Sequence, residues 1–402
     1  MQKHKSQQNE KNLIFVISGI QFCHVLDFMI MMPLGPILME ALKIDAHEFG
    51  LLVASYSFSA AISGILATTF IDRFERKRLI LAIFSLFTLA TLSCGLASGY
   101  YTLLVARGFA GAFGGIIGAL VQTMIGDAIP YARRAKAGGM VSTAFSIATV
   151  AGIPLSLWLA SNIQWRAPFI FIVVLALLFF LLGLKILPEL RQHLDHKGHV
   201  HPFSAMFAVL RDPNHLRALL YSALIIFSGF TIIPYITIYA VNNVGIHQQE
   251  IPIIYLVGGA ATFFTARRIG MWADRKGKVE VYRRLASGAI IPLLLVTHIG
   301  AVPLPVWLIC TTSFFVLISG RMIPAMTIIT SAAQPNLRGT FMSLNSTTQS
   351  LSMGLATLLA GFIIAHGEHG QIVGYPEVGY IAVAANVLAI WFVGKISILR
   401  YS

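Results

Sequence analysis

The sequence predicts an all-α membrane protein with twelve transmembrane helices in two pseudo-symmetric six-helix bundles. The chain has 402 residues, of which 56% are hydrophobic and 11% charged, and its mean hydropathy is +0.77. A soluble domain is about 45–50% apolar and about 25% charged, so this chain is too apolar to fold in water. Apolar runs of about twenty residues, which cross a hydrocarbon core of ~30 Å, recur along its whole length. Each run must satisfy its own backbone hydrogen bonds in lipid, which predicts helices.

The first apolar run extends from about residue 13 to residue 39 and follows a polar tail with three lysines. It is too long for the core of a signal peptide, contains Asp27 and Pro33, and has no small-residue cleavage site behind it, so we expect a retained first span. Polar breaks separate the twelve runs at residues 40–48, 72–78, 98–101, 129–136, 161–166, 186–217, 242–250, 270–284, 302–305, 334–339 and 366–376.

The longest break follows the sixth run and divides the chain into two halves of six runs each. Within it, Ser204 to Arg211, followed by Asp212 and Pro213, predicts a short amphipathic helix on the membrane surface. The predicted organisation is a tail (1–12), a first bundle (13–187), a linker (188–217), a second bundle (218–394) and a second tail (395–402).

Four histidines in this linker could suggest a metal site: His193, His196, His199 and His201. A solvated linker needs no metal and no cysteine partner lies nearby, so we expect neither a metal nor a cofactor. The three cysteines, Cys23, Cys94 and Cys310, lie inside apolar runs, where small packing residues are expected rather than disulfides.

The formal charge of +13 reflects topology rather than a nucleic-acid partner. Of the 29 Lys and Arg residues, 25 lie in the two tails and in the breaks on the same side of the membrane. Lys43 and Arg166 lie in breaks on the other side, and Arg107 and Arg321 lie within spans. By the positive-inside rule both termini are cytoplasmic, and we expect a bacterial-type inner membrane.

The two halves repeat each other. Asp27 is followed by Pro33 in the first span, and Ser228 is followed by Pro234 in the seventh, at an offset of 201 residues. An Asp-Arg pair follows the second span at residues 72–73 and the eighth span at residues 274–275, at an offset of 202. Arg107 in the fourth span corresponds to Arg321 in the tenth. Such repeats, with a binding site near the midplane between them, are typical of alternating-access transporters.

Two cytoplasmic breaks contain acidic and basic residues at matching spacing, and the second also contains glycine. The residues of interest in the second break are Gly270, Asp274, Arg275 and Gly277. Glycine would allow close helix contact, the Asp carboxylate can accept hydrogen bonds from the N-terminus of a neighbouring helix, and the basic residues anchor the loop. Together we expect these residues to latch one conformation. The first copy includes Asp72, Arg73 and Arg76 but has Glu75 and Thr68 in place of glycine. We call residues 72–78 and 270–278 the first and second latch loops.

These loops resemble the signature of the major facilitator superfamily, and the resemblance covers nearly the whole chain. Arg107 to Gly111 resembles the family's fourth-helix motif, and Gly152 with Pro154 resembles the fifth-helix motif of exporters, with Ser156 where glycine is common. Gly111, Gly152 and Pro154 are therefore expected to pack helices. Trp165 to Phe169 and Arg338-Gly339 are also usual in the drug and sugar efflux branch, whose members resemble drug:proton antiporters.

Asp27 is the one acidic residue expected deep within a span. An ionisable group at that depth is costly unless it meets water or a partner, so its default interpretation is functional. We expect Asp27 and Arg107 to couple proton movement to a conformational change. The alternative is a permanent ion pair that only holds the first and fourth helices together, but buried pairs add little stability.

The resemblance also implies that the first, fourth, seventh and tenth helices line a central cavity. Asp27, Arg107 and Arg321 would then surround one net-positive space, which favours a neutral, zwitterionic or anionic solute over a strongly cationic drug. Five polar residues within spans could bind the solute or hydrogen-bond between helices: Gln122, Tyr235, Tyr239, Asn345 and Gln349.

The predicted function is proton-coupled efflux of a small neutral or anionic organic solute by alternating access. Uptake by symport is the alternative, and sodium in place of protons stays open. A membrane sensor without transport would need neither latch loops nor a titratable group. An enzyme is not expected, because His24 and His298 lack catalytic partners and no phosphate loop is present. The expected partners are the solute, protons and the lipid bilayer, and one chain contains both halves, so a monomer suffices.

Overall fold

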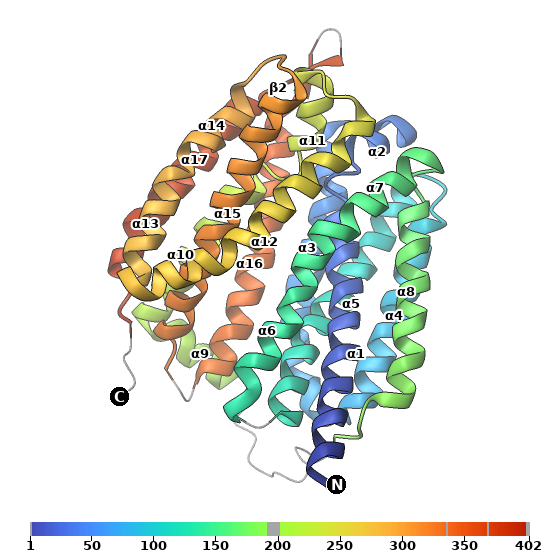
Figure 1. Cartoon of the computed structure of the whole chain (residues 1–402), viewed down its shortest axis with the longest axis vertical. Coiled ribbons are helices and arrows are strands. Elements are labelled where there is room, and N and C mark those ends of the chain that lie inside the picture. The colour runs from blue at the N-terminus through green and yellow to red at the C-terminus, as the bar shows by residue number, and fades with distance from the viewer. Residues whose placement is uncertain (1, 130, 191–201, 335–336, 368–369, 399–402) are drawn as a thin grey trace.

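A computed structural model describes residues 2–129, 131–190, 202–334, 337–367 and 370–398. Two helical bundles lie side by side, and both termini lie at the same end of the molecule (Figure 1). In the described ranges each bundle has six spans, and the first, fifth, seventh and ninth of the twelve are built from two or more consecutive helical pieces. The predicted fold class is confirmed.

The first half begins with α1 (Gln2–Ile30), and a turn leads to the short α2 (Gly35–Leu42) at the end of the molecule far from the termini. Its fifth span is composite, because the π-helix η2 joins two α-helices just before Pro154. The remaining elements are α3 (Ala46–Phe70), η1 (Ile71–Arg73), α4 (Arg76–Gly95), α5 (Tyr100–Ala128), α6 (Tyr131–Ile147), η2 (Ala148–Gly152), α7 (Ile153–Asn162) and α8 (Ala167–Ile186).

The second half follows the predicted linker helix, which the structure shows as α9 (Pro202–Arg211). The described elements after it are α10 (Pro213–Phe230), α11 (Ile236–Tyr239), η4 (Ala240–Val244), η5 (Gln248–Glu250), α12 (Ile251–Lys276), α13 (Lys278–Gly288), α14 (Ile290–His298), α15 (Leu304–Ala332), α16 (Arg338–Ile363), β1 (Ala365–His366), β2 (Ile372–Val373), α17 (Tyr375–Phe392) and η8 (Val393–Lys395). The two strands form a small antiparallel hairpin.

The first and seventh spans break at equivalent points. α1 ends at Ile30, just before Pro33, and α10 ends at Phe230, just before Pro234. Proline lacks the N–H that would continue the helix, and its ring disfavours helical conformation in the residue before it. The repeat at an offset of 201 residues is therefore visible in the backbone.

Among the described residues, eight helical stretches are long and apolar enough to cross a membrane. The other four spans depart from a simple apolar helix for identifiable reasons. The seventh and ninth are divided into α10–α11 and α13–α14. Arg267 and Arg268 lower the hydropathy of α12, and α16 is rich in Ser and Thr.

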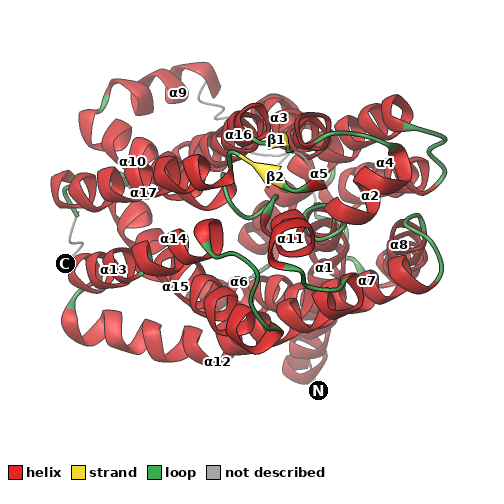
Figure 2. Ribbon diagram, turned by 90° about the horizontal axis from the view of Figure 1, so that it is seen from above, coloured by secondary structure: helices red, strands yellow, loops and turns green. Residues whose placement is uncertain are grey.

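The halves meet along α3 and α16, which pack against each other. Phe58 of α3 lies against Gly354 of α16, and Gly64 lies near Thr347. Seen from above, β1 and β2 lie beside the ends of these two helices (Figure 2). On another side of the molecule α12 contacts η2 and α7, with Gly259 close to Thr149 and Val150. From there α12 and α6 diverge toward the end where the termini lie (Figure 1).

Candidate solute and proton sites

An ion pair joins α1 to α5 in the middle of the first half. Arg107 Nη1 donates to Asp27 Oδ2 at 2.9 Å and to the backbone carbonyl oxygen of Asp27 at 3.2 Å. Thr91 Oγ1, from α4, donates to Asp27 Oδ1 at 3.2 Å. Both charged side chains are fully buried. Within the described spans Asp27 is the only buried carboxylate, so its charge is balanced by Arg107 alone.

His24 and Tyr56 extend this pair, although sequence reasoning expected no role for His24. The hydroxyl of Tyr56 lies 2.8 Å from His24 Nδ1, and the guanidinium of Arg107 lies 4.5 Å from the centre of the Tyr56 ring. His24 is partly buried, whereas Asp27, one helical turn further along α1, is fully buried. The spacing of three residues between His24 and Asp27 is the signal that could have linked them.

The second half holds an arginine at the equivalent place without a carboxylate. Arg321 Nη1 donates to Asn386 Oδ1, and Arg321 Nη2 donates to the carbonyl oxygen of Ile225 at 3.1 Å and to Ser228 Oγ at 3.3 Å. Its Nε–H has no partner, and the side chain is fully buried. Arg321 forms no ion pair within the described part of the chain.

A cavity of about 310 Å³ lies between the two halves. Its wall is mostly apolar, and Arg321 forms part of it. The aromatic and methionine side chains of the wall, which come from both bundles, are Phe28, Phe145, Phe230, Phe263, Phe315, Met29, Met32, Met322 and Met353. Ligand pockets usually enclose ~300–1,000 Å³, so this space fits a small organic molecule.

Of the residues predicted to line a solute cavity, Arg321 alone lies on this wall. Asp27 and Arg107 lie within the first bundle beside it, where Phe28 and Met29 reach the wall. Gln122 is exposed elsewhere on α5. Sequence does not fix the rotation of a helix about its axis, which explains the difference.

The other predicted polar groups mostly bond within the protein. Tyr235 donates to the carbonyl oxygens of Thr357 at 3.0 Å and of Ala46 at 3.3 Å. Tyr239 donates to the carbonyl oxygen of Ile299 at 2.9 Å, and Gln349 donates to Ser222 Oγ at 3.0 Å. Asn345 is buried, and its Oδ1 has no hydrogen-bond partner.

The first latch loop is anchored to its own bundle. Arg76 is buried, and its Nε donates to Asp127 Oδ2 at 2.8 Å, which ties α4 to the end of α5. Glu75, which replaces the usual glycine, accepts from the backbone N–H groups of Lys77 and Arg78 and so caps α4. Glu75 also accepts from the N–H of Leu190 at 2.9 Å, which fastens the start of the linker. Arg73 is exposed, and the side chain of Asp72 lies outside the described residues.

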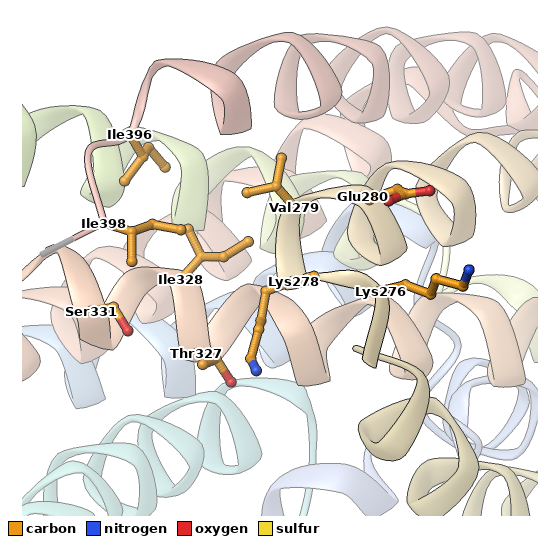
Figure 3. A pocket seen from close by; sticks show the side chains of 10 residues that line it. Lys276, Lys278, Val279, Glu280, Thr327, Ile328, Ser331, Ile396 and Ile398 are labelled. Carbon is orange, nitrogen blue, oxygen red and sulfur yellow. The ribbon is translucent and has the colours of Figure 1, made fainter. Parts of the chain in front are cut away.

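The second latch loop is open to solvent. Asp274 pairs with Lys278 at 2.7 Å and is 73% exposed, and Arg275 is exposed as well. Gly277 has φ of +95°, which favours glycine, and it turns the chain from α12 into α13. Beside it a hollow of about 720 Å³ lies between this loop, α15 and the C-terminal tail, with Lys278 pointing toward Thr327 and Lys276 pointing away (Figure 3).

Two of the glycine predictions are resolved by the structure. The expected close helix contact at Gly270 is wrong for this conformation, because a Cβ there would meet nothing within 4 Å. A Cβ at Gly111 would lie 2.2 Å from the carbonyl oxygen of Tyr56, and one at Gly152 would lie 2.7 Å from Leu26. Pro154 lies in the first turn of α7.

The four linker histidines fall at residues 193–201, outside the described residues. The part of the chain that the structure describes contains no group of three or more His, Cys, Asp or Glu side chains that could hold a metal ion.

Comparison with known proteins identifies the fold and the family. The family model described as Major Facilitator Superfamily matches residues 17–394. The chain is 23% identical to an uncharacterised MFS-type transporter, YceJ of Bacillus subtilis, over 92% of this chain and 94% of the relative. It is 20% identical to a probable sugar efflux transporter of Mannheimia succiniciproducens, over 88% and 86%.

Among solved structures, a bacterial homolog of the human lysosomal transporter Spinster matches with a TM-score of 0.74 at 17% identity. The match covers 96% of this chain and 97% of that one. The chain therefore belongs to the major facilitator superfamily and is a membrane transporter rather than an enzyme.

Proposed function

We propose that this chain is a proton-coupled exporter of a small organic solute, and that Asp27 is the group that binds the proton. The observation that carries the proposal is the burial of Asp27 against Arg107, next to a cavity between the two halves. A carboxylate whose only counter-charge is one arginine can exchange that partner for a proton when the surroundings change.

His24 supplies a route for the proton. It is partly buried, bonds Tyr56, and lies one turn from Asp27. A proton that reaches His24 would pass to Asp27, release Arg107, and so alter the contact between α1 and α5.

The arrangement of the halves supports alternating access. Tyr235 closes the end far from the termini, and α12 and α6 diverge toward the termini. The concentration of Lys and Arg in tails and same-side breaks favours a cytoplasmic location for both termini. Export is favoured over uptake by the similarity of the chain to a relative named as a probable sugar efflux transporter. We assign the protein to a bacterial inner membrane, acting as a monomer.

Reconstitution tests the proposal. Purified protein in liposomes that contain a pH-sensitive dye is offered a panel of small organic solutes, with and without an imposed proton gradient. Wild type should move protons with a solute. Asp27→Asn should keep downhill solute exchange but lose gradient-driven accumulation at least ~10-fold, because its side chain cannot gain and lose a charge.

Glu40→Gln, which removes an exposed carboxylate on α2, serves as the control and should behave as wild type. Gradient-driven accumulation that persists in Asp27→Asn would contradict the role of Asp27. Comparison of right-side-out with inside-out vesicles distinguishes export from uptake.

A further inference from the structure

The two halves differ at the positions that surround their buried arginines. At the offset of 201 residues, His24 and Asp27 correspond to Ile225 and Ser228. Ile225 and Ser228 provide two of the three acceptors that bond Arg321, so the two sites are structurally equivalent. Both titratable groups of the first site are thus replaced by neutral ones in the second.

The ring that covers the first arginine is also missing in the second half. At the offset of 202 residues, Tyr56 corresponds to Gly258. Tyr56 stacks on the guanidinium of Arg107, whereas Gly258 has no side chain and lines the cavity together with Arg321. Beside Gly258 lies the ring of Phe315, which a Cβ there would approach to 2.4 Å and which also lines the cavity.

Arg321 is a buried cation whose charge is not balanced within the described residues. Its three acceptors, Asn386, Ile225 and Ser228, are all neutral, and its Nε–H has no acceptor. Burying a charge without a counter-charge is costly, and arginine cannot lose its proton to avoid the cost. An anionic group brought by a ligand would balance it, and the Nε–H without a partner is available to donate to that group.

We infer that the cavity binds a lipophilic monoanion, an aromatic or branched carboxylic acid whose carboxylate is held by Arg321. The five phenylalanine and four methionine side chains of the wall would contact the apolar body of this ligand. Methionine adapts to irregular apolar shapes, which suits a series of related acids. This inference rests on the proposed transport function and narrows its solute class.

Binding to the full-length protein in detergent tests the inference with three probes of one shape. Isothermal titration compares 1-naphthoate, 1-naphthamide and 1-naphthylmethylammonium. A charged hydrogen-bonding partner should make wild type bind the carboxylate about 10- to 100-fold more tightly than the amide, with the ammonium weakest.

Arg321→Gln should remove that preference and leave the affinity for the amide unchanged, and Arg321→Lys should restore part of it. Arg284→Gln, which changes an exposed arginine of the same bundle, is the matched control and should retain the preference. Equal binding of carboxylate and amide, an equal loss of both in Arg321→Gln, or no saturable binding of the carboxylate to wild type would overturn the inference.

Exchange of radiolabelled probes in liposomes separates this inference from the proposed function. Transport of the neutral amide without any preference for the carboxylate would overturn the role of Arg321 and leave the transport proposal standing. Carboxylate-selective binding without proton-linked transport of any solute would support the role of Arg321 and contradict the proposed coupling.

Discussion

The hydroxyl of Tyr235, in the second half, shares its one proton between the carbonyl oxygen of Thr357 at 3.0 Å and the backbone carbonyl oxygen of Ala46, in the first half, at 3.3 Å. Gly50 and Gly361 make room for the hydroxyl. A Cβ at Gly50 would lie 2.4 Å from the hydroxyl oxygen of Tyr235, and a Cβ at Gly361 would lie 2.6 Å from it. The hydroxyl thus bridges the two halves at the end where they are closed.

Tyr235→Phe should weaken this closure by ~1 kcal/mol, the usual net worth of one hydrogen bond, and so shift the balance of conformations about fivefold. Spin labels at the exposed ends of α5 and α12, placed by Tyr101→Cys and Ile253→Cys, would show a larger population at long distance. Tyr239→Phe, whose hydroxyl bonds within the second half, is the control. Identical distance distributions in the Tyr235 variant and wild type would refute the bridge.

Gly270→Trp should leave stability within ~0.5 kcal/mol of wild type, because the position faces open space in this conformation. If α6 and α12 approach each other during transport, the indole would block them, and solute exchange should fall at least ~10-fold. Gly300→Trp, at another open position in the loop before α15, should keep full exchange. Normal exchange by Gly270→Trp would show that these helices do not close there.

Asp27→Asn should cost only ~1–2 kcal/mol of stability, because the amide oxygen still accepts from Arg107, and Arg321 shows that neutral acceptors can hold a buried guanidinium. Asp27→Leu should cost ~3–5 kcal/mol, since it removes the side-chain acceptor altogether. Thermal unfolding in detergent measures both. Equal costs would mean that the negative charge, rather than the hydrogen bond, holds the site together.

Gly111→Ala should destabilise the protein by ~1–3 kcal/mol or more, because its Cβ would overlap the backbone of Tyr56 and force α5 away from α3. Gly118→Ala, two turns further along the same helix, meets nothing within 4 Å and should gain up to ~1 kcal/mol from better helix propensity. Thermal unfolding should therefore show a loss of stability for Gly111→Ala and a small gain for Gly118→Ala. A change of the same sign in both variants would argue against the close contact at Gly111.

Asp212 caps α10 outside the membrane spans. Burial by itself would raise the pKa of Asp212, but hydrogen bonds from the N–H groups of Asn214 and His215 and from Gln334 hold the pKa below its usual value. A lowered pKa in the folded state stabilises the protein above the unfolded pKa, and that stability is lost as the pH falls through the folded pKa.

Asp212→Ala should therefore cost ~1 kcal/mol at pH 7, and its difference from wild type should shrink below about pH 4. Asp212→Asn keeps an acceptor and should cost less. Unfolding curves from pH 7 to pH 3 would test this, and a difference between Asp212→Ala and wild type that grows on acidification would contradict it.

Much of the fold follows from local sequence because hydropathy and proline act over short distances. The breaks at Pro33 and Pro234 and the anchored arginine in each half could be foreseen in this way. Asp27 was predicted to meet Arg107 because a buried charge needs a partner, and the structure pairs them at 2.9 Å. Whether that pair carries protons stays a prediction.

Other features depend on helix rotation and on contacts between distant residues. Tyr56 meets His24 across 32 residues, and no local pattern shows it. Gln122 is exposed and does not line the cavity, although its position along α5 is suitable. Glu75 was regarded as a departure from the family pattern, but the structure uses it as a helix cap. The repeat does relate Tyr56 to Gly258, as it relates Asp27 to Ser228.

The fastening of Leu190 to Glu75 gives the molecule a mechanical asymmetry. The loop that receives the linker is locked by buried contacts of Glu75 and Arg76, whereas its counterpart around Asp274 is loose and solvated. Of the two loops, the first is therefore the firmer anchor for the start of the linker. A pull on Leu190 would reach the cap of α4 first, and α4 is the helix that also contributes Thr91 to the carboxylate of Asp27.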